Sequence, residues 1–343
     1  MSRPNTNLSL HPRLLDWWSD NPSDPDRPTL DNPDVRRLIQ TIEPKSHITD
    51  LGGVMSLNAR LDPAGRVLRV HQPFVSRPRL LALQNVRQRL ASQGLIVPIP
   101  LRWRGAAIFR CGNRWAELEA FIPHARPKPT LNSYSWMFQA MGALHRALAK
   151  LKLPVPRPLV ATYAPPGTLR RWLPITEAAA HADPEAADIA QLLRDLVRRL
   201  RGQWLPASQL PVQLVHGDVR LSNVCQTPNG APVYFDFGFL ACRPRIHDLA
   251  YALAYMVLAL NGHPPPREFA WPSLAGLIEA YESAAASRLT PAERKALIPY
   301  TAAVPIYHAA IGGFSNDPVR QLRSARPFLR LSEWLLEHSG AAV

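Results

Sequence analysis

The sequence has few of the features that mark membrane, disulfide-linked or metal-binding proteins. Its longest apolar run, residues 249–260, has about 12 residues and is shorter than the roughly 20 that cross a bilayer. No basic and then apolar stretch opens the chain, so we expect no secretory signal. The 343 residues suffice for one large or two medium domains. Only three cysteines occur, without metal-ligand spacing, and we expect reduced thiols in a cytoplasmic protein: Cys111, Cys225 and Cys242.

Acidic residues are missing from one long interval, although the chain contains 26 of them. Between Asp62 and Glu117 there is none, while ten arginines fall in the same interval and the formal net charge is +14. Such a field favours anionic partners over a Debye length of about 8 Å. A nucleotide is one such partner, and a generally basic composition without local function is the other interpretation. No nucleic-acid motif is recognised, so we do not expect nucleic acid as the partner.

Two carboxylates and one carboxamide follow one another at a fixed spacing in the second half of the chain. His216-Gly217-Asp218 is followed by Asn223, and an apolar strand then leads to Asp236-Phe237-Gly238. Kinase catalytic loops use this spacing: the Asp accepts the proton of the attacking hydroxyl, and the Asn and the later Asp hold metal ions. An Asp in a turn is also commonly a cap, so the interpretation depends on the order of the residues rather than on any single one.

With Ile246-His247-Asp248-Leu249-Ala250 after it, this segment resembles the aminoglycoside phosphotransferase and choline kinase group of kinase-fold enzymes. The resemblance covers residues 46–255. It implies an α+β, bilobal, protein-kinase-like fold with a small antiparallel-sheet N-lobe (46–124) and a large, mostly helical C-lobe (125–343), after an N-terminal extension (1–45). It also implies ATP and Mg²⁺ as cofactors, with Asp218 as catalytic residue and with Asn223 and Asp236 as metal ligands.

The N-lobe pattern supports the resemblance. Gly52-Gly53, with Ser56 and Asn58, resembles the family's shortened glycine loop, in which backbone N–H groups approach phosphate. Glu119 and Phe121 lie in a segment that resembles the hinge, whose backbone groups pair with adenine. Periodicity predicts strands at residues 46–51, 57–61, 67–70, 96–103, 106–111 and 115–122 and a helix at 79–93.

Two departures from the family pattern concern nucleotide binding. Arg69 stands where the usual Lys would be, and it can still pair with the α- and β-phosphates. Helix 79–93 has no acid to hold that cation, and Gln84 is nearest to the expected position. Arg69 is therefore expected either to be positioned by other groups or to leave ATP binding weak.

The C-lobe is expected to be helical from residue 133, with a proline-rich connection at 153–174, a helix at 186–205 and a break near 261–266. His145 is expected to be structural. In the extension, helices are expected near residues 14–18 and 35–42, the second capped by Asp31 or Asn32. The tryptophans and tyrosines of this lobe either line an acceptor pocket or belong to the core: Trp172, Trp204, Tyr255, Trp271, Tyr281 and Tyr307.

The sequence thus predicts an ATP- and Mg²⁺-dependent O-phosphotransferase that acts on a small hydroxylated metabolite or antibiotic, as a monomer or homodimer. Arg220 either clamps the transferring phosphate or is a surface residue. The acceptor is expected to be neutral or anionic, because a basic chain repels a polycationic aminoglycoside. The alternative is a kinase-like protein that has lost catalysis and serves in binding or regulation; Arg69 and the acid-free helix favour it.

Overall fold

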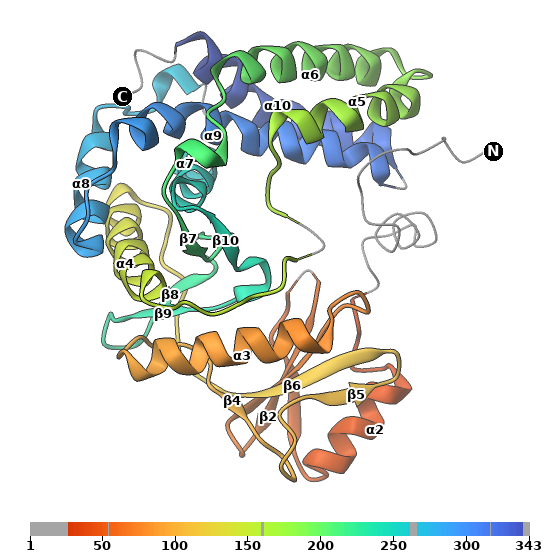
Figure 1. The fold of residues 1–343 in the computed structure, drawn as a ribbon. Helices are drawn as coiled ribbons and strands as arrows, with labels where there is room; N and C mark the ends of the chain where they lie inside the picture. The colour runs from red at the N-terminus through yellow and green to blue at the C-terminus, as the bar shows by residue number, and fades with distance from the viewer. Residues whose placement is uncertain (1–26, 54, 159–160, 261–265, 316, 339–343) are drawn as a thin grey trace.

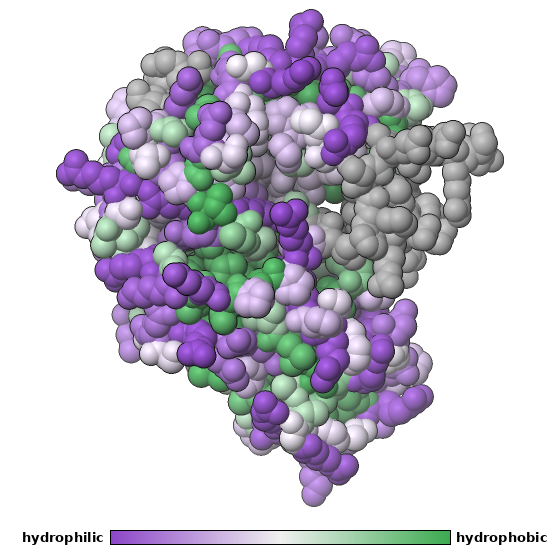
Figure 2. Space-filling view, viewed as in Figure 1, coloured by the Kyte–Doolittle hydropathy of each residue, from purple (hydrophilic) through white to green (hydrophobic). Residues whose placement is uncertain are grey.

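The computed structural model describes residues 27–53, 55–158, 161–260, 266–315 and 317–338, and these form two lobes (Figure 1). The small lobe is a sheet with two helices, and the large lobe is mostly helical. The helix expected near residues 14–18 lies outside the described residues. Figure 2 shows that hydrophilic residues dominate the outer ends of both lobes, while hydrophobic residues gather near the middle of this face. The expected α+β bilobal fold is confirmed.

The small lobe is built on an antiparallel sheet of order β1-β2-β3-β6-β4, with β5 paired to β6. Side chains alternate along β2, where Leu57, Ala59 and Leu61 are fully buried and their neighbours are half-exposed. Burying each leucine contributes about 1.5–3 kcal/mol. The elements are α2 (Pro33–Ile42), β1 (His47–Asp50), β2 (Leu57–Asp62), β3 (Arg66–Val70), α3 (Arg77–Ser92), β4 (Pro100–Leu101), β5 (Phe109–Cys111) and β6 (Arg114–Ala120).

Helix α2 begins where the sequence predicts, and Asn32 is its cap. The Asn32 side chain accepts hydrogen bonds from the N–H groups of Asp34 and Val35, and Pro33 occupies the first turn, where no N–H is needed. The buried face of α2, with Val35 and Ile39, packs into the core of the sheet. The end of the N-terminal extension is therefore an integral part of the small lobe.

Helix α3 joins the two lobes. It belongs to the small lobe, yet its buried Leu83, Val86 and Leu90 pack in the same hydrophobic cluster as Met137 and Met141 of the large lobe. The strand pairs β7–β10 and β8–β9 lie between the small lobe and the helices above them (Figure 1). The remaining elements are α4 (Leu131–Ala149), α5 (Pro166–Ala180), α6 (Pro184–Gln203), β7 (Val212–Val215), β8 (Val224–Gln226), β9 (Pro232–Tyr234), β10 (Ala241–Pro244), α7 (Ile246–Leu260), α8 (Ser273–Ala285), α9 (Pro291–Ile311) and α10 (Pro318–Glu337).

Two expectations about secondary structure are wrong. Residues 153–174 are not all connection, because α5 begins at Pro166 and includes Pro174. A proline in the first turn of a helix costs no hydrogen bond. Pro174 lies in the helix interior, where its missing N–H removes one backbone hydrogen bond, and the helix nevertheless continues through it. The strand expected at 96–103 shrinks to β4, and Ile96 forms a bridge with Val233 instead. Among the described residues, no helix is long and apolar enough to span a membrane.

Candidate active site

The backbone of the HGD loop (residues 216–223) is fixed by Asp248 at the start of α7. Its carboxylate accepts the N–H of His216 and of Gly217, both at 2.8 Å, and a bond from His145 Nε2 at 2.9 Å. Burial opposes ionisation of Asp248, but the hydrogen bond and charge of His145, with smaller contributions from His247 and His216, together outweigh it and lower the pKa of Asp248 to about 2. Gly217 has φ +87°, and a Cβ there would lie 2.5 Å from the Phe239 carbonyl oxygen. The expected structural role of His145 is confirmed.

Asp218 is 2% exposed and lies against Asn223. The Asn223 amide nitrogen donates to the Asp218 backbone carbonyl at 2.9 Å and to carboxylate Oδ2 at 2.8 Å. Burial raises the pKa of Asp218, while nearby Arg220 acts in the opposite direction. Within the described residues, Oδ1 of Asp218 is a buried oxygen without a hydrogen-bond partner. Its hydrogen-bonding capacity is therefore unused, although Arg220 forms an ion pair with it.

Arg220 is paired with Asp218, and its side chain is 37% exposed. Its Nε lies 2.9 Å from Asp218 Oδ1, and its Nη2 donates to Oδ2 at 3.1 Å. The Nε–Oδ1 contact is a close ion pair whose angle is not that of a hydrogen bond. The guanidinium also lies 5.2 Å from the centre of the Tyr255 ring.

Asp236 is brought to the HGD loop by the chain between them. His216 Nε2 donates to the Phe235 carbonyl at 2.7 Å, and the Phe235 N–H donates to the Asn223 carbonyl at 2.8 Å. Asp236 itself has φ +56°, in the left-handed region, which is uncommon for a non-glycine residue and is frequent at functional sites. Asp218, Asn223 and Asp236 are therefore assembled as their spacing predicts, although their roles remain predictions.

These side chains have the chemistry that a hard divalent cation requires. Burial opposes ionisation of Asp236, but Arg69 lowers its pKa to about 2, so the carboxylate is ionised at neutral pH. The amide nitrogen of Asn223 donates to Asp218. Among the described groups, the amide oxygen of Asn223 accepts only a long 3.4 Å hydrogen bond from the Ser222 hydroxyl. Carboxylate and amide oxygens suit Mg²⁺. We find that the residues present fit the expected ion.

Arg69 reaches across to the large lobe. Its Nη2 donates to Asp236 Oδ1 at 2.6 Å. Burial by itself would lower the pKa of Arg69, but the charges of Asp236 and of the β6 acids outweigh it, and the pKa is raised. In the β3–β6 register, Arg69 lies opposite Glu117. The expectation that groups outside helix 79–93 position Arg69 is confirmed.

The acid-free helix carries the reverse charge arrangement. Arg87 of α3 donates to the carboxylates of both Glu117 and Glu119 on β6, and Gln84 Nε2 donates to Glu117 at 2.8 Å. All four side chains are buried. Burial opposes ionisation of Glu117, yet Arg87 keeps its pKa below the usual range. A cation on the helix and acids on the strand thus replace the expected helix Glu.

The glycine loop is shaped by Asn58. Its Nδ2 donates to the Gly52 carbonyl at 2.8 Å, and the Gly52 N–H donates to Asp50 at 2.8 Å. Gly53 has φ +119°, and a Cβ there would lie 2.8 Å from the Asn58 amide. Ser56 follows in the bend before β2. Asn58 therefore holds the loop, and its predicted contact with phosphate remains untested.

In the hinge segment, two of the predicted groups already have partners. The Glu119 carboxylate is bound by Arg87, and the Phe121 N–H donates to the Gly65 carbonyl at 2.9 Å. Glu119 also lies inside β6, between β3 and β4. Any contact of these residues with adenine would therefore use backbone groups that remain, such as the Phe121 carbonyl.

The sequence profile of the phosphotransferase enzyme family matches residues 58–286, which is more than half of the chain. The chain belongs to the phosphotransferase enzyme family. Its HGD loop and Asp236 fall within the matched residues. The protein is thus a phosphotransferase, and the resemblance read from the motifs is confirmed. No curated protein matches the sequence.

Solved structures of kinases share the fold of this phosphotransferase over most of its length. A microcompartment-associated aminopropanol kinase has a TM-score of 0.68 at 17% identity, covering 89% of this chain and 98% of its own. An amicoumacin kinase in complex with AMP-PNP, Ca²⁺ and Ami has a TM-score of 0.64 at 15% identity, and the match covers 89% of this chain and 94% of that one. A choline kinase from Cryptosporidium parvum Iowa II has a TM-score of 0.61 at 12% identity, and the match covers 89% of this chain and 96% of that one. At these identities the likeness shows the fold alone.

Sequence reasoning missed one buried cation that connects the lobes of the phosphotransferase. Arg79 of α3 donates through Nη2 to the carbonyls of Gly238 at 2.6 Å and Leu240 at 3.0 Å, and through Nη1 to that of Pro156. Burial lowers the pKa of Arg79 to about 10. Because Gly238 follows Asp236 by two residues, α3 holds the segment that carries this carboxylate. No pattern in the sequence distinguishes Arg79 from its arginine neighbours.

Proposed function

We propose that this phosphotransferase moves the γ-phosphoryl group of ATP, with Mg²⁺, to a hydroxyl of a small neutral or anionic molecule. The observation that carries the proposal is the Asp218 carboxylate: it is buried beside Asn223 and near Asp236, and its Oδ1 is ion-paired with Arg220 but accepts no hydrogen bond. Asp218 would orient the hydroxyl and accept its proton, since alignment and charge neutralisation supply most of the acceleration in phosphoryl transfer.

The other residues take roles that follow from their contacts. Asn223 and Asp236 would hold the cation, which supplies charge neutralisation on the phosphates. Arg69 would leave Asp236 for the α- and β-phosphates, since a phosphate and a carboxylate compete for the same guanidinium. The loop at Gly52 and Gly53 would bring backbone N–H groups to phosphate. Arg220, held at Asp218, would face the transferring group.

The alternative, a kinase-like protein without catalysis, loses its main support. Arg69 is held by acids from β6 and by Asp236 rather than left without partners, so the missing helix Glu does not imply weak nucleotide binding. The two functions are separated by incubating the protein with Mg²⁺, ATP and pools of hydroxylated compounds and measuring the ADP that is formed. The proposal expects acceptor-dependent release that Asn223→Ala abolishes and that Asn229→Ala, in an exposed turn, retains. Mg²⁺–ATP binding without release for any pool would favour the alternative.

A further inference from the structure

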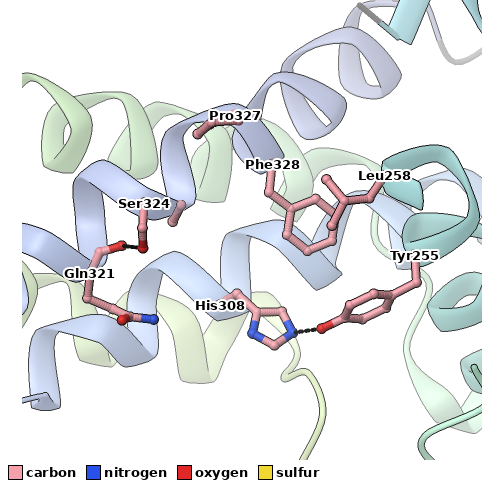
Figure 3. A pocket seen from close by; sticks show the side chains of 8 residues that line it. Tyr255, Leu258, His308, Gln321, Ser324, Pro327 and Phe328 are labelled. Carbon is pink, nitrogen blue, oxygen red and sulfur yellow. Dashed lines mark hydrogen bonds between the residues drawn. The ribbon is translucent and has the colours of Figure 1, made fainter. Parts of the chain in front are cut away.

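A small cavity lies between three helices of the large lobe and has a volume of about 220 Å³. Tyr255 and Leu258 come from α7, His308 comes from α9, and Phe328 comes from α10 (Figure 3). The three rings are mutual neighbours, with centroids 5.7–5.9 Å apart, and the Tyr255 hydroxyl lies 2.9 Å from His308 Nε2. The remaining lining residues are Gln321, Ser324, Ala325 and Pro327.

Two sets of contacts connect this cavity to Asp218. Arg220, which is paired with the Asp218 carboxylate, has its guanidinium 5.2 Å from the centre of the Tyr255 ring. Tyr251, one helical turn before Tyr255, interacts with both the Asp218 carboxyl and the Tyr255 hydroxyl. The cavity is therefore separated from the Asp218 carboxylate by the side chains of Arg220, Tyr251 and Tyr255, which contact one another.

The lining disfavours charged ligands of either sign. No carboxylate lines the cavity, and a cation on the Tyr255 face would meet Arg220, which already lies over that ring. The charge of Arg220 is matched by Asp218, so it offers little to a carboxylate or phosphate of the ligand. Burial, with Arg220 nearby, lowers the pKa of His308 to about 4, so the imidazole is neutral near pH 7. What remains is flat apolar surface with a few neutral hydrogen-bonding groups.

The volume indicates which part of a ligand fits inside the cavity. An engineered cavity of about 150 Å³ binds benzene, and 220 Å³ is roughly one and a half times as large. A single ring with a short side chain fills such a space, and any larger part of a ligand would extend past the exposed residues at its open side, Gln321, Ser324 and Pro327. We propose that this cavity binds the body of the acceptor, and that the acceptor is an uncharged alcohol with one flat apolar ring. The inference rests on the proposed function.

The test uses matched acceptors and a variant that fills the cavity. The acceptors are benzyl alcohol, 2-phenylethanol and 3-phenoxy-1,2-propanediol, each with a counterpart that has a cationic aminomethyl group on the ring, together with kanamycin. Ser324→Trp adds bulk at an exposed position that lines the cavity, and Arg330→Trp adds it at an exposed position of α10 outside the lining. Melting temperatures establish that both variants fold, and calorimetry gives their Mg²⁺–ATP affinity.

We expect kcat/KM for the best neutral alcohol to exceed that of its cationic counterpart at least tenfold. Ser324→Trp should lower it at least tenfold without changing Mg²⁺–ATP affinity, and Arg330→Trp should leave both unchanged. Preference for the cationic counterpart or for kanamycin, or full activity of Ser324→Trp, would overturn the inference and leave the proposed function standing. Failure to bind Mg²⁺–ATP, with no turnover of any acceptor, would overturn both.

Discussion

The Arg69 guanidinium of the small lobe donates a hydrogen bond to the Asp236 carboxylate of the large lobe at 2.6 Å. One partner is the predicted phosphate-binding cation, and the other is a predicted metal ligand. The pair therefore joins the two halves of the proposed nucleotide site. Each partner also compensates the charge of the other while both are partly removed from water.

Replacing Arg69 should weaken use of the nucleotide. Arg69→Met removes charge-assisted hydrogen bonds to phosphate, each contributing about 1.5–3 kcal/mol, so kcat/KM for ATP should fall about 10- to 100-fold. Arg66→Met, on the same strand and paired with Glu43, is the matched control and should change it little. Steady-state kinetics with varied ATP measure both, and equal values for the two variants would contradict the role of Arg69.

The buried ion pair between Arg87 and Glu117 should be important for stability. Removing Arg87 leaves the buried carboxylates of Glu117 and Glu119 without this cation, so Arg87→Met should lower the free energy of unfolding by about 3–5 kcal/mol. Glu43→Gln breaks a half-exposed pair with Arg66 and should cost about 1 kcal/mol or less. Urea unfolding measures both. A similar small loss for both variants would mean that the buried charges are hydrated.

Gly142 of α4 is required where that helix meets α8. A Cβ at this position would collide with the Tyr281 carbonyl and lie 2.9 Å from the Ala285 nitrogen. Gly142→Ala should therefore destabilise the protein by about 1–3 kcal/mol through overpacking. At Gly276, in the interior of α8, a Cβ meets nothing within 4 Å, and Gly276→Ala should stabilise by about 0.5–1 kcal/mol. Urea unfolding should therefore show changes of opposite sign in the free energy of unfolding of the two variants. A lower free energy of unfolding in both would count against the packing argument.

His308 should make stability depend on pH. Its pKa is about 4 in the folded chain and about 6.5 when unfolded, so below pH 6.5 the unfolded state binds the proton that the folded state does not. Stability should fall as pH decreases from about 6.5 to 4, by up to about 3 kcal/mol from this residue. His308→Gln should flatten that part of the curve, and exposed His181→Gln is the control. Parallel curves for wild type and His308→Gln would contradict the burial argument.

The order of HGD, Asn223 and Asp236 was enough to predict that these residues come together, because local spacing fixes the geometry of one loop and one strand, whereas the two lobes were predicted from the family resemblance that this order supports. The Asn32 cap was predictable for the same reason. The partners of Arg69 were not, since Glu117 is 48 residues away in sequence and faces it only through the β3–β6 register. The start of α5 was hidden because proline at a first turn resembles proline in a connection.

The cavity shows the same limit. Tyr255 was recognised as an aromatic that either lines a pocket or belongs to the core, but its neighbours His308 and Phe328 come from two later helices. No spacing in the sequence brings α7, α9 and α10 together, because the contact is set by packing of the whole lobe. The residues that we propose for acceptor choice could therefore be found only from the fold.

The most direct test of the account is the transfer of labelled γ-phosphate from ATP to the best acceptor by wild type and Asp218→Asn, in single turnover. Asp195→Asn, half-exposed on α6, is the matched control. We predict that Asp218→Asn reduces the transfer rate at least about 100-fold, since a positioned base typically contributes 10²–10⁴-fold, with unchanged Mg²⁺–ATP affinity by calorimetry. Transfer by Asp218→Asn at the wild-type rate would contradict the account.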